Sequence, residues 1–230
     1  MNKPTEEFEL KKVNIAIDGP AGAGKSTIAK SVAKALGIIY LDTGAMYRAV
    51  ALKAARQGID TRDADKLAQM VKSIEIRIAH IGIEQQIFLD GEDVTHKIRT
   101  PEISIGASNV AAIPAVRLKL VELQREIADK NSIVMDGRDI GTYVLPNAEL
   151  KIFLNASVEE RALRRYKEQI AKGISGISLE EVKKDIEYRD KNDSSREFAP
   201  LSKAADAVEI DTTNYTIEQV AEKIMSLIKE

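Results

Sequence analysis

A glycine-rich segment near the start of the chain has the residue types that bind a row of phosphates. It matches the pattern G-x-x-x-x-G-K-[ST] at every specified position, which a random chain of this length would do about once in a hundred. Glycines let the backbone N–H groups approach phosphate oxygens, lysine supplies a compact cation, and a serine hydroxyl suits Mg²⁺. The residues expected to bind a nucleoside triphosphate are Gly19, Pro20, Ala21, Gly22, Ala23, Gly24, Lys25, Ser26 and Thr27.

A strand and a helix flank this segment, as a phosphate loop requires. The apolar, β-branched run Val13–Ile17 is typical of a buried strand, and Lys25–Leu36 has helical periodicity. A helix that begins here directs the positive end of its dipole at bound phosphate. A glycine-rich turn without a ligand is the competing interpretation. The loop alone does not select a reaction, because it also serves GTPases, motor ATPases and regulators.

Strands and helices alternate along most of the chain. This pattern predicts an α/β, phosphate-loop (P-loop) three-layer fold with a five-stranded parallel sheet. Alternation from Ile74 onward and the turn at Asp90-Gly91 predict an additional small antiparallel β insert. The expected parallel strands are 13–17, 38–41, 133–136, 150–154 and 207–210. Helices are expected at 25–36, 46–57, 63–72, 114–130, 157–171, 178–191 and 216–228, with capping boxes opening those at 157 and 178.

The composition limits the possible chemistry. The 230 residues include no cysteine and only two histidines, which excludes thiolate catalysis and Cys-ligated zinc. The net charge of −2 gives no overall attraction to nucleic acid or membranes. No apolar run is long enough to span a membrane, and Met1–Lys12 lacks the apolar core of a secretory signal. We therefore expect a cytoplasmic monomer with an N-terminal extension at 1–12.

Further motifs resemble those of bacterial cytidylate kinases, a branch of the nucleoside monophosphate kinases. Two of them, DTGAMYR (42–48) and DGRD (136–139), follow predicted strands, where ligands bind in open α/β sheets. The resemblance covers almost the whole chain, in the order of the family. Its motifs are IDGPAGAGKST (17–27), LDTGAMYRA (41–49), LDGEDVTHKIRTPEI (89–103), DGRDIGTYV (136–144), KIFLNAS (151–157) and YRD with the downstream Asp193 and Arg196 (188–196).

The resemblance implies transfer of the γ-phosphoryl group of ATP to CMP and dCMP, with Mg²⁺. It also implies a kinase core at 13–230, which contains a nucleoside-monophosphate-binding insert at 62–115 and a short helical lid at 164–185. A monophosphate is mostly dianionic near pH 7 because its second pKa is about 6. Its attacking oxygen therefore needs no general base, and catalysis reduces to alignment and charge stabilisation.

Several side chains become candidates for these tasks. Arginines must offset the negative charge of two bound nucleotides. The arginines near 161–165 could instead form a basic helix face that is merely exposed to solvent. Asp136 is expected to position Mg²⁺ together with Ser26, or to organise Arg138. The alternative is that its carboxylate only caps the backbone at the end of its strand. The acceptor phosphate is assigned to Arg48, Arg138 and Arg189, and the transferring group to Lys25, Arg138, Arg161, Arg165 and Arg196. Ser108, Arg117 and Asp139, with Thr43 nearby, are expected to read the base, and Asp193 the sugar.

Two other functions remain open at this point. A different small-molecule kinase of the UMP, AMP or shikimate type would share the phosphate loop but not the pyrimidine pocket. A non-enzymatic regulator with a phosphate loop would bind or hydrolyse nucleotide without an acceptor.

Overall fold

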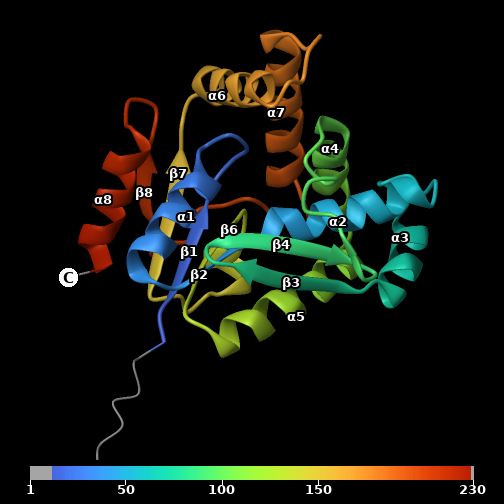
Figure 1. Ribbon diagram of the computed structural model, residues 1–230, viewed down its shortest axis with the longest axis horizontal. Coiled ribbons are helices and arrows are strands. Elements are labelled where there is room, and N and C mark those ends of the chain that lie inside the picture. The colour runs from blue at the N-terminus through green and yellow to red at the C-terminus, as the bar shows by residue number, and fades with distance from the viewer. Residues whose placement is uncertain (1–11, 229–230) are drawn as a thin grey trace, which may run out of the picture.

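A five-stranded parallel sheet forms the centre of the protein, for which the computed structural model describes residues 12–228 (Figure 1). The strand order is β2-β6-β1-β7-β8, and all neighbouring strands are parallel. The expected α/β sheet is therefore confirmed. Its strands are β1 (Asn14–Asp18), β2 (Ile39–Asp42), β6 (Ile133–Gly137), β7 (Leu150–Asn155) and β8 (Val208–Asp211).

Helices cover both faces of the sheet. One face carries α1 (Lys25–Leu36) and α8 (Ile217–Ile228), and the other carries α2 (Thr43–Arg56) and α5 (Pro114–Lys130). Successive residues of a strand point to opposite faces. In β1, Ile15 and Ile17 accordingly join the core with α1 and α8, whereas Ala16 joins the core with α2 and α5. Burial on both faces explains the continuous apolar runs Ile15–Ile17 and Ile133–Met135 in the central strands β1 and β6.

The predicted antiparallel insert is also present. It consists of β3 (Ile76–Ile81), β4 (Glu84–Leu89) and β5 (Glu92–Asp93), in the order β3-β4-β5. Asp90 and Gly91 both have left-handed backbone angles, φ 49° and 84°, as the Asp-Gly signal predicts for a tight hairpin turn. The β3–β4 end of this sheet lies beside α1, where the Lys30 ammonium is 2.7 Å from the Glu84 carboxylate. The remaining elements here are α3 (Ala64–Met70), η1 (Val71–Ser73) and α4 (Pro101–Val110).

A pair of helices, α6 (Val158–Ala171) and α7 (Leu179–Ser194), lies beyond the carboxyl ends of the strands (Figure 1). The short connection between them contains Gly173 and Gly176, both left-handed at φ 77° and 79°. Gly141 lies in η2 (Ile140–Val144), a single π-helical turn after β6.

The structure differs from the sequence-based expectations at three places. Helix α2 begins at Thr43, three residues earlier than predicted, because the Asp42 side chain accepts from the Ala45 N–H and caps it. Helix α4 was not predicted. The capping box at Ser178 is complete, but at Ser157 only half of it forms, since the Glu160 carboxylate bonds Arg164 instead. The proposed extension at 1–12 lies almost entirely outside the described residues.

Candidate functional site

A cavity of about 930 Å³ lies at the carboxyl edge of the parallel sheet. Its walls come from the phosphate loop, the residues that follow β2 and β6, helices α4 to α7, and the β8–α8 connection. The phosphate loop and the segments 42–48 and 136–139 were predicted to meet at this edge, and residues of all three line the cavity. Two phosphate-bearing ligands could share such a cavity.

The phosphate loop has the tight backbone that its glycines predict. Gly22 and Gly24 are left-handed, with φ 78° and 87°, and a Cβ at Gly19 would lie 2.0 Å from the Leu154 carbonyl oxygen. Lys25 is buried, and its ammonium donates to the Pro20 carbonyl oxygen at 2.7 Å. Burial, and then the positive charge of Arg138, lowers the pKa of Lys25 well below its usual value. An anionic ligand here would relieve that electrostatic cost.

Asp136 connects the loop to the end of β6. Its carboxylate accepts from the Ser26 hydroxyl and the Tyr40 hydroxyl, both at 2.9 Å, while Thr43 donates to its backbone carbonyl at 2.8 Å. Burial, and then the neighbouring Asp42 charge, raises the pKa of Asp136 to about 6. Two carboxylates at adjacent strand ends therefore create a local negative field that favours a cation.

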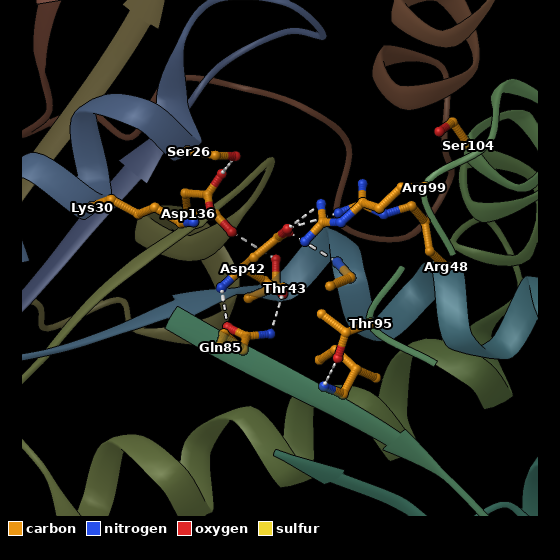
Figure 2. A network of polar contacts seen from close by, with 12 residues as sticks. Ser26, Lys30, Asp42, Thr43, Arg48, Gln85, Thr95, Arg99, Ser104 and Asp136 are labelled. Carbon is orange, nitrogen blue, oxygen red and sulfur yellow. Dashed lines mark hydrogen bonds and ion pairs between the residues drawn. The ribbon is translucent and has the colours of Figure 1, made fainter. Parts of the chain in front are cut away.

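Asp42 organises a second network, which Figure 2 shows. Its carboxylate accepts from Arg48 at 2.7 Å and from Arg99 at 2.9 Å. These arginines outweigh burial and hold the pKa of Asp42 well below its usual range. The Gln85 side chain of β4 bonds both the N–H and the carbonyl of Asp42, at 2.7 and 3.3 Å, and so ties the insert to strand β2. The arginine pair faces the cavity with its geometry already set.

Asp193, near the end of α7, organises the opposite wall. Its carboxylate accepts from Ser108 at 2.7 Å, from Arg138 at 2.8 Å, and from Arg196. Burial alone would raise the pKa of Asp193, but Arg138 and Arg196 lower it to about 2. Arg189 lies close by, and burial together with the Arg138 charge lowers its pKa to about 10. Arginines held this close together indicate a site for an anion.

Arg117 and Asp139 form a buried ion pair at the inner end of the cavity. Arg117 is completely buried, and its guanidinium donates to the Asp139 carboxylate and to the Ala111 carbonyl oxygen. Burial outweighs Arg117 and raises the pKa of Asp139. The pair thus presents a fixed donor and an adjacent acceptor among apolar neighbours such as Ala107.

Arg161 and Arg165, which lie on one face of α6, have different surroundings. The Arg161 guanidinium is buried and bonds the Ala21 carbonyl at 2.9 Å and the Asp190 carboxylate at 2.6 Å, and Asp190 also accepts from the Ala21 N–H. Arg161 therefore holds the phosphate loop against α6 and α7 and does not line the cavity. Arg165 lines the cavity and pairs with Glu168. A contact of Arg161 with the transferring group stays a prediction.

Most of the candidate residues line this single cavity. Gly19, Pro20 and Arg161 do not. Arg99 and Arg164 also line it, although neither had been assigned a role: Arg99 is a lone arginine in a loop, and Arg164 had only been grouped with Arg161 and Arg165 on one predicted helix. The cavity-lining candidates are Ala21, Gly22, Ala23, Gly24, Lys25, Ser26, Thr27, Thr43, Arg48, Ser108, Arg117, Asp136, Arg138, Asp139, Arg165, Arg189, Asp193 and Arg196.

Within residues 12–228, no helix is both long and apolar enough to cross a membrane. Within the same residues, no group of three or more His, Asp or Glu side chains could by itself hold a metal ion.

A family model and the sequence relatives agree on one family. A sequence model described as cytidylate kinase matches residues 15–230. The cytidylate kinase of Limosilactobacillus reuteri (strain DSM 20016) is 54% identical over 220 residues, 96% of each chain. That of Ligilactobacillus salivarius (strain UCC118) is 55% identical over 221 residues, 96% of this chain and 98% of the other. A solved structure of an uncharacterized protein from Eubacterium ventriosum ATCC 27560 has a TM-score of 0.51 and 17% identity, covering 95% of this chain and 99% of that one, and supports the fold alone.

Proposed function

The chain belongs to the cytidylate kinase family, and we propose that it transfers the γ-phosphoryl group of ATP to CMP and dCMP, giving ADP and CDP or dCDP. One observation carries this proposal: the phosphate loop and the buried Arg117–Asp139 pair open into the same cavity. A donor triphosphate on the loop and a cytosine at the pair would bring two phosphates together between the arginines. The 62–115 insert would then hold the acceptor, and residues 164–185 would act as the lid.

The base pocket follows from the hydrogen-bonding pattern of cytosine. Cytosine has acceptors at O2 and N3 and a donor amine at position 4, whereas uracil has an N–H at position 3 and a carbonyl at position 4. Arg117 can only donate, and ionised Asp139 can only accept. Ser108 adds a hydroxyl beside them. Uracil would oppose donor to donor and acceptor to acceptor, so the pocket favours cytosine.

Charge and alignment account for the phosphoryl transfer. The acceptor phosphate lies against Arg48, Arg138 and Arg189, and its dianion attacks without a general base. Lys25 and Arg196 face the transferring group, with Arg165 approaching from the lid side. Lys25, Arg48, Arg138, Arg165 and Arg196 are each preorganised by a carboxylate or by the loop backbone, so little reorganisation accompanies the buildup of charge in the transition state.

Mg²⁺ fits the oxygen atoms near the loop. Ser26 and Asp136 supply a hydroxyl and a carboxylate 2.9 Å apart, in a field made more negative by Asp42. Mg²⁺ is commonly bound by one or two protein oxygens together with phosphates and water, so a small protein ligand set suits it. When bound, the ion neutralises charge on the triphosphate. Ser26 and Asp136 would hold it directly or through water.

A panel of acceptors tests this proposal. ADP release should be measured with ATP and each of CMP, dCMP, UMP, AMP and GMP, and with no acceptor. We expect turnover with CMP and dCMP, little with the others, and almost none without acceptor. ATP turnover that does not depend on any monophosphate would instead identify a nucleotide-binding regulator. We propose that the enzyme acts as a monomer; size-exclusion chromatography with light scattering would check this. The cytoplasmic location stays a prediction.

A further inference from the structure

The turn that carries Asp139 into the base pocket receives its cap from a distant strand. This turn, η2, leaves its first backbone N–H groups without acceptors of its own, as every helical N-terminus does. Asp18, the last residue of β1, fills that role. Its Oδ1 accepts from the Ile140 N–H and its Oδ2 from the Gly141 N–H, both at 2.8 Å.

Asp139 stands at the position where an aspartate normally caps its own helix. Elsewhere in this protein aspartates do so: Asp42 caps α2 by accepting from the Ala45 N–H, and Asp63 caps α3 in the same way. The Asp139 side chain makes no capping hydrogen bond and pairs with Arg117 in the cavity. Asp42 both caps α2 and pairs with Arg48, whereas the Asp139 carboxylate pairs with Arg117 and leaves the N–H groups of its own turn to another acceptor.

We propose that Asp18 is a positioning residue for base recognition: it caps η2 in place of Asp139 and leaves the Asp139 carboxylate free to pair with Arg117 and the base. This inference rests on the proposed cytidylate kinase function. Without the Asp18 carboxylate, the N–H groups of Ile140 and Gly141 would compete with Arg117 for Asp139.

Packing around Asp18 leaves the turn little freedom to compensate. Asp18 is buried, and a Cβ at Gly141 would lie 3.1 Å from the Lys151 side chain and 3.5 Å from the Asp18 carboxylate. Burial outweighs both N–H bonds and raises the pKa of Asp18 to about 7. A charged group in this position is unfavourable for stability.

Asp18 also connects the two ends of the cavity. It immediately precedes Gly19, the first residue of the phosphate loop, and its strand pairs with β6, which ends at Gly137. The Asp18 carboxylate therefore joins the end of β1, which leads into the phosphate loop, to η2, the turn next to the proposed base pocket.

The test compares Asp18→Asn with wild type by steady-state kinetics. Asparagine keeps the shape but can accept from only one of the two N–H groups, and its amide opposes the other. We expect the CMP:UMP ratio of kcat/KM to fall about 10-fold, mainly through KM for CMP, with KM for ATP changing less than about 2-fold. Asp63→Asn, which weakens an ordinary cap at a residue that does not line the cavity, is the matched control and should leave the ratio unchanged.

Other outcomes overturn the inference. Equal losses for CMP and UMP, or a matching rise in KM for ATP, would show that Asp18 merely stabilises β1. Asp139→Asn is measured beside it to separate two failures. If Asp139→Asn lowers the CMP:UMP ratio and Asp18→Asn does not, only the capping role fails. If Asp139→Asn leaves the ratio unchanged, the proposed base pocket fails.

Measurements on the wild-type protein keep the test independent of variant folding. Amide hydrogen exchange at Ile140 and Gly141 should be as slow as at Met135 in β6, because both N–H groups are bonded to a buried carboxylate. Exchange as fast as at Gly82, in the β3–β4 turn, would overturn the capping role. Asp18→Ser, which places a smaller neutral acceptor there, should lower the CMP:UMP ratio in the same direction as Asp18→Asn.

Discussion

The donor and acceptor ends of the cavity obtain their polar groups in different ways. The phosphate loop is one continuous segment, Gly19–Thr27, whose backbone and Lys25 supply most of what a triphosphate needs. The acceptor end is assembled from side chains far apart in the chain, such as Ser108 with Asp193 and Arg138 with Asp193. In the proposed site, a local motif therefore binds the donor, whereas side chains held by long-range ion pairs bind the acceptor.

The electrostatics of the two ends differ as well. Asp136, beside the loop, has a pKa raised to about 6 by burial and by Asp42. Asp193, at the acceptor end, has a pKa of about 2 because arginines outweigh its burial. The donor end thus holds carboxylates that a cation would stabilise, and the acceptor end holds carboxylates that already have cationic partners. Substitutions at the two ends should differ accordingly in their effects on rate, base choice and stability.

The largest expected effect is at the donor end. Lys25→Ala should lower kcat about 10²- to 10³-fold, because it removes a preorganised charge worth about 3–4 kcal/mol in the transition state. The melting temperature should hardly change, since burial already disfavours the Lys25 charge. Lys30→Ala, on the same helix but at the surface, is the matched control. A folded Lys25→Ala enzyme with near-normal kcat would refute the assignment of the loop.

Base choice should respond only at the acceptor end. Asp139→Asn and Arg117→Met should each reduce the CMP:UMP ratio of kcat/KM about 10-fold or more, because each buried mismatch costs about 1–3 kcal/mol. Asp139→Asn should act mainly by slowing CMP. Arg117→Met should also destabilise the fold by about 3–5 kcal/mol, since it leaves Asp139 buried without its partner. Arg77→Met, on the insert surface, controls for loss of an arginine; an unchanged ratio in both pocket variants would show that the base is read elsewhere.

Lowering the pH should reduce the free energy of unfolding through protonation of Asp193 at the acceptor end. Its folded pKa of about 2 lies below the ordinary 3.8, so it stabilises the fold above about pH 4, and this stabilisation is lost as the pH falls toward 2. Asp193→Asn should therefore lower the free energy of unfolding at pH 7 by about 2 kcal/mol, and its difference from wild type should shrink in acid. Urea unfolding at several pH values measures this. The exposed Asp129→Asn serves as the control, and a difference that does not vary with pH would argue against the ion pairs.

The smallest effect concerns the connection between α6 and α7. Gly173 and Gly176 are left-handed, and a Cβ at either would meet nothing within 4 Å, so this part of the proposed lid is open around both glycines. We expect amide exchange there to slow when CMP and a non-hydrolysable ATP analogue are both bound, and less with either alone. Identical exchange with and without both ligands would contradict a closing lid.

Much of the fold could be predicted because its signals are local. Apolar runs such as Ile133–Asp136 locate the buried strands, and Asp90-Gly91 locates the hairpin turn. Helix α4 was missed because Pro101–Val110 carries small and polar residues whose burial comes from packing against α2 and α7. Half of the capping box at Ser157 failed for a similar reason, since Glu160 finds a tertiary partner in Arg164. Local rules fail where a distant side chain offers a better partner.

The sequence by itself determined the phosphate loop, the alternation of strands and helices, and the set of arginines and aspartates available to the site. These follow from residue type and spacing along a continuous segment. Only the tertiary structure decided which charges pair: Arg161 with Asp190 at the loop, Arg99 with Asp42, and Asp18 with the turn after Asp139. The physical reason is that the energy of a buried charge depends on its distance from opposite charges and N–H groups, and the fold sets that distance.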